Sequence, residues 1–229
     1  MKYFTFLDLE VERLSEMAAK YGSLCNGLKK QLDEEVVSVQ FATGGDIMHR
    51  GYYCPSPVQD IVVGGCKRGK LLKQPNANGK FNYKYGFDSN GKMITVEHFS
   101  LKPDEIIVRQ DQVEIGIEFK EIYGIFAITE CVYSGSQIMS YAYALYDPFE
   151  KYVIETKKEL YSYSAEGLEK ADFLSVVGSK SLFGHQQYTF QHDEDGYLSC
   201  YTYDEIVKGA VKPSIWNGHV FDIKVKRKV

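Results

Sequence analysis

The feature that most constrains the fold of this chain is a long succession of strand-like segments at hairpin spacing. Runs of β-branched and aromatic residues with alternating polarity recur at 81–87, 92–99, 104–109, 112–119, 122–133, 137–146, 151–163, 186–192, 197–203 and 219–227. Strands that follow one another without regularly spaced helices are typical of antiparallel sheets rather than of parallel βαβ units. The 18 Tyr and 13 Phe agree with this, because aromatic residues favour pleated surfaces. The pattern predicts an antiparallel meander.

Residues 9–33 show a different, helical periodicity. Apolar residues such as Leu14, Met17 and Tyr21 recur at three- and four-residue steps, and Asp8 is placed to cap the first turn. Gly22 and Gly27 leave open whether this region is one helix or two shorter ones.

Two further segments are less regular. We expect a short helix from Ala165 to Phe173, and residues 46–80 should form long loops around a short strand, QDIVVGG.

These elements together predict an α+β fold. An N-terminal amphipathic helix or helix pair would pack on a large, mostly antiparallel β-meander, as either a curved sheet or a sandwich. Residues 1–229 should make a single domain, with a helical part at 8–34 and a β-rich part at 36–229.

Two turns of the predicted meander share one pattern. YKYGFDSNGKM (83–93) and YTFQHDEDGYL (188–198) agree at their Tyr, Asp, Gly and terminal apolar positions. Asp and Asn favour tight turns, and Gly adopts the left-handed conformation that a three-residue hairpin loop requires. We therefore expect hairpins over 83–98 and 188–203. Their structural turn residues are Asp88, Asn90 and Gly91, and Asp193, Asp195 and Gly196.

The first hairpin resembles the YD repeat of bacterial Rhs and wall-associated proteins, whose unit reads Y-x-Y-D-x-x-G-[RK]-L before a β-branched run. The likeness is carried by Tyr83, Tyr85, Asp88, Gly91, Lys92 and Met93, with Asp88 two residues later than in the repeat. It covers the stretch 81–99 and lacks the tandem array of an Rhs shell. Short hairpins of this kind are also similar to segments of small cytosolic proteins encoded beside polymorphic toxins, including immunity proteins. The resemblance implies a bacterial protein that binds a toxin domain.

Neither turn provides a complete set of metal ligands. A calcium loop with Gly91 at its sixth position would place Gly86, which has no side-chain oxygen, at its first. His192 beside Asp193 and Asp195 forms only part of a transition-metal site, and no HExxH or CxxC motif occurs. We expect no metal and no cofactor.

The five cysteines are odd in number and widely scattered, which is typical of reduced thiols. The N-terminal residues contain no apolar stretch like that of a signal peptide, and no window approaches a membrane span. The expected location is cytoplasmic, with no membrane partner.

The segment 44–54, GGDIMHRGYYC, offers the one enzyme-like arrangement. Cys54 could act as a nucleophile with His49 as its base and Asp46 orienting the base. The alternative is that Cys54 is a small buried thiol and Asp46 a loop residue, because catalytic Cys and His residues usually meet through the fold rather than along one loop. Motifs of serine hydrolases, P-loop enzymes and dinucleotide-binding folds are absent.

The strand 111–121, DQVEIGIEFKE, is the best candidate for a partner surface. Its apolar residues occupy one face, and its acidic residues occupy the other. On that second face Gly116 would leave room for an approaching group. The predicted partner-binding residues are Asp111, Glu114, Gly116, Glu118 and Glu121.

The function that best fits these observations is non-catalytic protein binding, by an immunity protein that neutralises a cationic toxin domain encoded nearby. One alternative is an enzyme of unfamiliar family that uses Cys54 and His49. Another is a nucleic-acid binder through the basic segment 67–84, although the net charge of -4 disfavours it. The oligomeric state is left open.

Overall fold

The computed structural model describes residues 2–73, 81–99, 103–147, 149, 153–177, 182–207, 210–212 and 218–229. Its helices are α1 (Lys2–Gly22), α2 (Cys25–Glu35) and the short α3 (Gln59–Val62), with a 3-10 turn, η1, at Gly51–Tyr53. Its strands are β1 (Ser38–Thr43), β2 (Lys70–Leu72), β3 (Tyr83–Phe87), β4 (Met93–His98), β5 (Asp104–Gln110), β6 (Val113–Lys120), β7 (Gly124–Ser134), β8 (Gln137–Tyr146), β9 (Val153–Ser164), β10 (Gly167–Val177), β11 (Leu182–His192), β12 (Leu198–Val207), β13 (Ala210–Val211) and β14 (Val220–Asp222).

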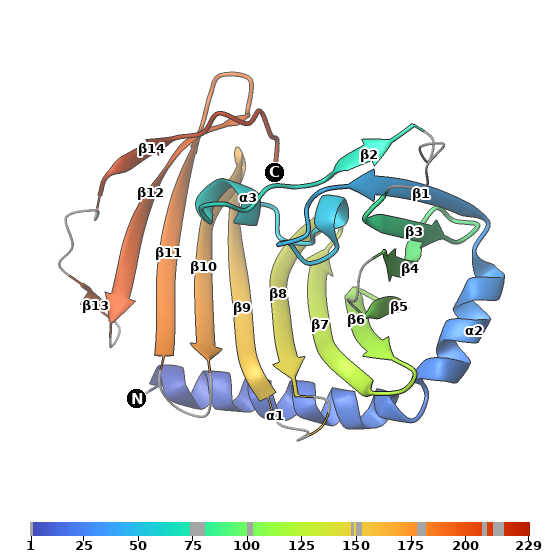
Figure 1. The fold of residues 1–229 in the computed structure, drawn as a ribbon. Coiled ribbons are helices and arrows are strands. Elements are labelled where there is room, and N and C mark those ends of the chain that lie inside the picture. Colours follow the sequence, from blue (N-terminus) through green and yellow to red (C-terminus); the bar gives the residue numbers. More distant parts are fainter. Residues whose placement is uncertain are drawn as a thin grey trace.

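Within the described residues these strands form one 14-stranded sheet. From β3 to β13 each strand pairs antiparallel with the next in sequence, β1 lies between β2 and β3, and β14 pairs with β12. The sheet is strongly curved, and β1 and β2 turn over one end of it (Figure 1). The expected meander is therefore present, as a single curved sheet.

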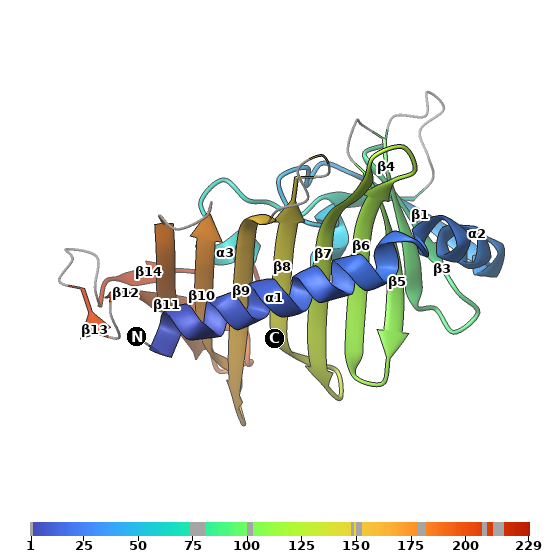
Figure 2. The ribbon, with the colours of Figure 1, turned by 90° about the horizontal axis from the view of Figure 1, so that it is seen from below.

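One face of the sheet, here called the helix face, is covered by α1 and α2. Helix α1 runs obliquely across the strands (Figure 2). Leu14, Tyr21 and Cys25 of the helices share a buried cluster with apolar residues of β5, β6, β7 and β8. Two small residues of that cluster, Ala142 and Ala144, lie on β8, where α1 passes over the sheet. Burial of this apolar stripe holds α1 on the sheet.

The opposite face, here called the loop face, is covered by residues 44–69, which include η1 and α3 (Figure 1). Val58, fully buried, packs there with aromatic residues of β8, β9 and β11. Met48, Cys54 and Cys66 form a smaller buried cluster within the same segment. Both faces of the central strands are thus covered, so side chains at alternate positions along these strands are buried on one face or the other.

The α+β class expected from the sequence is wrong. The described chain is dominated by one antiparallel sheet, and the N-terminal helices supply only a layer on one of its faces. Helical periodicity identified the N-terminal helical region, but it did not show how small a part of the fold that region makes.

Three local expectations are also wrong. Asp8 lies inside α1, not at its start. The expected helix Ala165–Phe173 is part of β10, because this segment continues the meander by pairing with β9 and β11. The expected strand QDIVVGG contains the helical turn α3. Of the expected strand 151–163, residues 151 and 152 lie outside the described residues.

The two predicted glycine turns are present. Gly91 and Gly196 have φ of 72° and 77°, in the region that favours glycine. Asp88 Oδ1 accepts the backbone N–H groups of Asn90 and Lys92 at 2.9 and 2.8 Å. The second turn repeats this arrangement, with Asp193 Oδ1 accepting from residues 195 and 197 at 3.1 and 2.8 Å. The shared sequence pattern therefore corresponds to a shared Asp-centred turn.

In the part of the chain that the structure covers, no helix combines the length and apolar character that crossing a membrane requires.

Candidate functional site

A tight loop presents two consecutive side chains, His49 and Arg50, to the loop face of the sheet. Arg50 has φ of 57°, a left-handed conformation that is uncommon for a residue with a side chain. The hydroxyl of Tyr85 on β3 donates to the Arg50 carbonyl oxygen at 2.9 Å. The hydroxyl of Tyr83 lies 3.3 Å from the carbonyl oxygens of Gly45 and Met48. The alternating tyrosines of β3 thus hold the loop in place.

The Arg50 guanidinium is buried and bound by carboxylates from two strands. Its Nε lies 2.9 Å from both oxygens of Glu105 on β5, and its Nη2 lies 2.7 Å from Oε1. Its Nη1 forms an ion pair with Glu114 on β6, which also pairs with Arg109. Breaking a buried pair of this kind is strongly destabilising. The network therefore fastens the loop to the sheet.

Gly116 makes room for this network. A Cβ atom at position 116 would collide with the Glu105 carboxylate, the Arg50 guanidinium and the Thr129 hydroxyl. The sequence suggested that Gly116 leaves space for an approaching group, and the group that approaches is Arg50 of the same chain.

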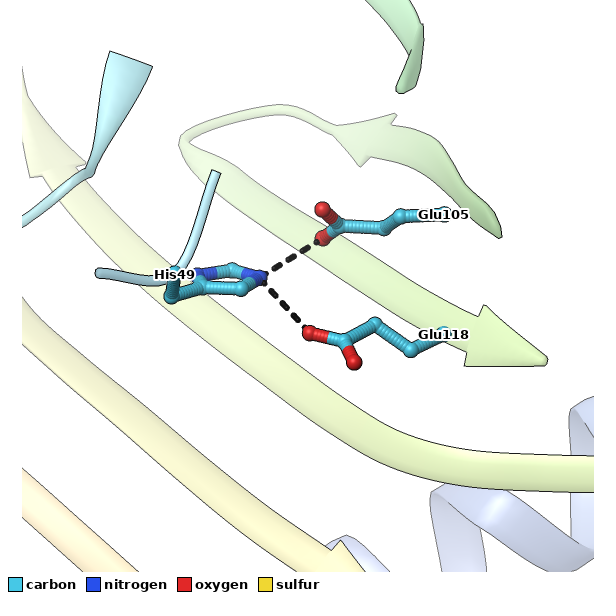
Figure 3. A group of neighbouring side chains, drawn as sticks. All are labelled: His49, Glu105 and Glu118. Carbon is cyan, nitrogen blue, oxygen red and sulfur yellow. Dashed lines mark ion pairs between the residues drawn. The ribbon is translucent and has the colours of Figure 1, made fainter. Parts of the chain in front are cut away.

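His49 lies between two carboxylates (Figure 3). Its Nε2 is 3.2 Å from Glu105 Oε1 and 3.3 Å from Glu118 Oε1. Its Nδ1 is 3.2 Å from the Tyr141 hydroxyl, and the two rings stack. Glu105 and Glu118 face each other directly across the β5–β6 ladder. Strand register thus brings the two acids together, and the loop places an imidazole between them.

Neighbouring charges decide the ionisation of this cluster. Burial alone would raise the pKa of Glu105, but its interactions with Arg50 and His49 outweigh burial and lower that pKa to about 2. Burial opposes the charge on Arg50, yet Glu105 and Glu114 keep its pKa well above the ordinary value. The cluster is therefore ionic under physiological conditions.

A cavity of about 320 Å³ opens beside the cluster. His49, Glu105 and Glu118 line it together with Tyr143, His98 and Lys157. The cavity gives small polar species access to the imidazole and both carboxylates. Such an arrangement can bind a cation or exchange a proton.

The Cys54, His49 and Asp46 arrangement does not form a catalytic triad. Cys54 Sγ contacts Gln59 Oε1 at 3.4 Å, and burial raises the pKa of this thiol to about 12. The Asp46 side chain is 52% exposed, and its Oδ1 lies 3.7 Å from His98 Nε2. Thiolate chemistry is disfavoured because the reactive form of cysteine is the anion.

The loop face also contains a second buried acid, Glu159 on β9. Ser56 Oγ donates to its carboxylate at 2.5 Å, and the Tyr161 hydroxyl also donates to it. Burial raises the pKa of Glu159 to about 7, and these hydrogen bonds oppose the increase only in part. Glu159 was not identified from the sequence.

The predicted partner-binding residues of 111–121 differ in their exposure to solvent. Asp111 and Glu121 are exposed at the ends of β6. Glu114 and Gly116 are buried, and Glu118 lines the cavity, so the expectation that their face is exposed is wrong. The reason is that residues 44–69 cover this face. Charge reversal at Glu114 would therefore test folding, not binding.

The basic segment 67–84 is only partly available to a ligand, and residues 74–80 lie outside the described residues. Arg68 donates to the carbonyl oxygens of Tyr52, Cys54 and Ser56. Lys84 pairs with Glu97 at 2.8 Å. Two of the cations are thus used inside the fold.

Three large apolar side chains are exposed at neighbouring loop tips. Ile122 and Tyr123 lie in the β6–β7 turn with exposures of 86% and 47%, and Phe149, between β8 and β9, is 73% exposed. The rings of Tyr123 and Phe149 meet edge-to-face at 5.6 Å. A cleft of about 780 Å³ beside them is lined by Lys29, Lys30, Asp33 and Glu34 of α2. We call Ile122, Tyr123 and Phe149 the tip cluster.

No known protein-family model matches this chain, and a search of curated proteins finds no similar sequence.

Sequence reasoning missed Glu105 and Arg50 as site residues. Glu105 could have been found by pairing the two predicted strands across their short connection, which places it opposite Glu118. No comparable signal exists for Arg50, whose contacts with Glu105 span 55 residues of sequence.

Proposed function

We propose that this chain is a non-catalytic protein-binding protein, and that it acts as a bacterial immunity protein that binds a toxin domain in the cytoplasm. The observation that carries the proposal is the tip cluster. Monomeric proteins rarely leave neighbouring large apolar side chains in water without a function, and aromatic residues dominate the binding energy of protein interfaces.

The surroundings of the tip cluster support a protein partner. Lys29 and Lys30 of α2 lie about one helical turn before the acids Asp33 and Glu34 beside the cleft, and Glu121 precedes the cluster. An apolar centre within a rim of mixed charge is the usual composition of a protein interface. The YD-like hairpin at 83–98 supports the same proposal, because it resembles segments of proteins encoded beside toxins. The buried acids of β6 are balanced by Arg50 and Arg109, so they no longer favour a cationic partner.

The enzyme alternative has less support. Cys54 Sγ contacts the neutral amide of Gln59, and burial raises the pKa of the thiol, so its reactive anionic form is disfavoured.

Binding to the product of the adjacent toxin-type gene tests the proposal. The wild-type chain should co-purify with that product and protect cells that express it. Ile122→Asp and Phe149→Asp should each weaken binding by at least about tenfold, because each places a charge at an apolar contact. The matched control is Ile47→Asp, at an isoleucine of 76% exposure outside the tip cluster.

Two results would reject the proposal at different levels. Wild-type protein that neither binds nor protects would remove the immunity function. Full affinity in both tip variants, with native circular dichroism, would remove the tip cluster as the interface.

A further inference from the structure

The imidazole nitrogen of His49 that faces the carboxylates has no normal hydrogen bond. The His49 side chain is 8% exposed, and its Nε2 is buried without a hydrogen-bond partner among the described residues. Buried polar nitrogens are nearly always hydrogen-bonded, so this exception requires an explanation. The oxygens of Glu105 and Glu118 are close enough to bond but lie off the direction of a ring N–H.

The position of the two carboxylates also favours a cation between them. Glu105 and Glu118 are direct cross-strand neighbours, and like charges in that position are destabilising. Arg50 occupies the side of Glu105 that faces Glu114. On the remaining side, Glu105 Oε1 and Glu118 Oε1 converge on His49 Nε2 (Figure 3). All three residues line the cavity.

The distances within this group match the ligand shell of a transition metal. A metal about 2.1 Å from each ligand, in tetrahedral or octahedral geometry, separates adjacent ligand atoms by about 3.0–3.4 Å. The measured separations from Nε2 are 3.2 and 3.3 Å, and all three ligand atoms lie within 4.8 Å of one another. A metal on the axis of the ring nitrogen also places the carboxylate oxygens off that axis, as observed.

We propose that His49, Glu105 and Glu118 form a binding site for a divalent transition metal, with Zn²⁺ as the favoured ion. Zinc accepts one imidazole nitrogen and carboxylate oxygens, whereas Ca²⁺ and Mg²⁺ prefer oxygen ligands throughout. The cavity leaves space for water to complete the coordination shell. No sequence motif marks this site, because its ligands come from a loop and two strands.

The surrounding residues fit the role of outer partners. The Tyr141 hydroxyl lies 3.2 Å from His49 Nδ1, where it can accept the ring N–H and leave Nε2 for the metal. Arg50 holds the Glu105 carboxylate in orientation through contacts with both of its oxygens, at 2.9 Å from Nε to each and 2.7 Å from Nη2 to Oε1.

Metal titration of chelator-treated protein tests the site. Calorimetry with ZnCl₂ should show one equivalent bound by the full chain, and CaCl₂ or MgCl₂ should show no comparable binding. Glu118→Gln keeps the side-chain shape and should weaken zinc binding at least about 100-fold, because loss of a ligand exceeds the effect of losing an outer partner. His49→Gln should do the same. Co²⁺ should give a visible absorption band in the wild type that both variants lose.

The control is His185→Gln, which removes another buried histidine–carboxylate pair, His185 with Asp172 at 2.8 Å. This variant should bind zinc like the wild type. Failure of the wild type to bind zinc stoichiometrically would overturn the proposal. Unchanged zinc affinity in folded Glu118→Gln would also overturn the proposal, because the metal would then bind elsewhere on the protein. Neither result bears on the tip cluster, whose partner is assayed separately.

Discussion

At the scale of single residues, two buried glutamates on the same face of the sheet titrate in opposite directions. Glu105 contacts the Arg50 guanidinium and His49, and these interactions lower its pKa to about 2. Glu159 contacts the uncharged hydroxyls of Ser56 and Tyr161, and burial raises its pKa to about 7. The difference follows from the charge of the neighbours, since both carboxylates are removed from water.

Glu159 should make the free energy of unfolding pH-dependent. An acid with a raised folded-state pKa binds a proton more tightly when folded, so stability falls as pH rises from about 4.5 to about 7 and then levels off. Between those two pH values, the free energy of unfolding of Glu159→Gln should rise relative to that of the wild type by up to about 3 kcal/mol, because the amide cannot ionise. Urea unfolding at pH 4, 6 and 8 measures the gain. Glu166→Gln, at an exposed turn, is the control, and a pH-independent difference for Glu159→Gln would contradict the prediction.

At the scale of elements, two distant hairpins use the same turn. β3–β4 and β11–β12 each place an Asp carboxylate over the following backbone N–H groups and a Gly at positive φ. These contacts are local, so the turns form from a few consecutive residues wherever the pattern occurs. The strands on either side differ in burial and neighbours, which shows that the turn is independent of its packing environment.

Gly91→Val should destabilise the protein by about 1 kcal/mol or more, because valine is strained at positive φ. The open space around position 91, with no atom within 4 Å of an added Cβ, separates this strain from any steric collision. Gly64→Val is the matched control, since that position is equally open but has no positive φ. Thermal melting compares the two. Equal melting temperatures would show that turn conformation does not limit stability.

At the scale of the whole molecule, the C-terminal residues hold the segment that covers the loop face. Their contacts join them to segments far from them in the sequence, and none of these contacts involves the N-terminal helix. Arg227 near the C-terminus forms a two-pronged ion pair with Asp60 of α3 at 2.6 and 2.8 Å and donates to the Pro57 carbonyl oxygen. The backbone N–H of Leu168 donates to the carbonyl oxygen of Val229 at 3.0 Å. The segment that presents His49 and Arg50 is thus held by both halves of the chain.

Arg227→Ala should lower the free energy of unfolding by about 2 kcal/mol, because it leaves the largely buried Asp60 carboxylate with one cation fewer. Lys224→Ala, at an exposed position of the same segment, should change it little. Denaturant titration measures both. A stability loss shared equally by the two variants would indicate that Arg227 has no specific role.

The sequence by itself determined the features that depend on neighbouring residues. Alternating polarity predicted the meander and most strands of the sheet, and the Asp–Gly pattern predicted two turns, because strand faces and tight turns are set by periods of two to four residues. The tertiary structure alone decided which strand faces are buried. Glu114 and Glu118 have the alternation of an exposed face, yet residues 44–69 cover them and supply Arg50 and His49 as their partners. That contact is absent from any local pattern because it depends on how a loop closes over strands more than 50 residues away.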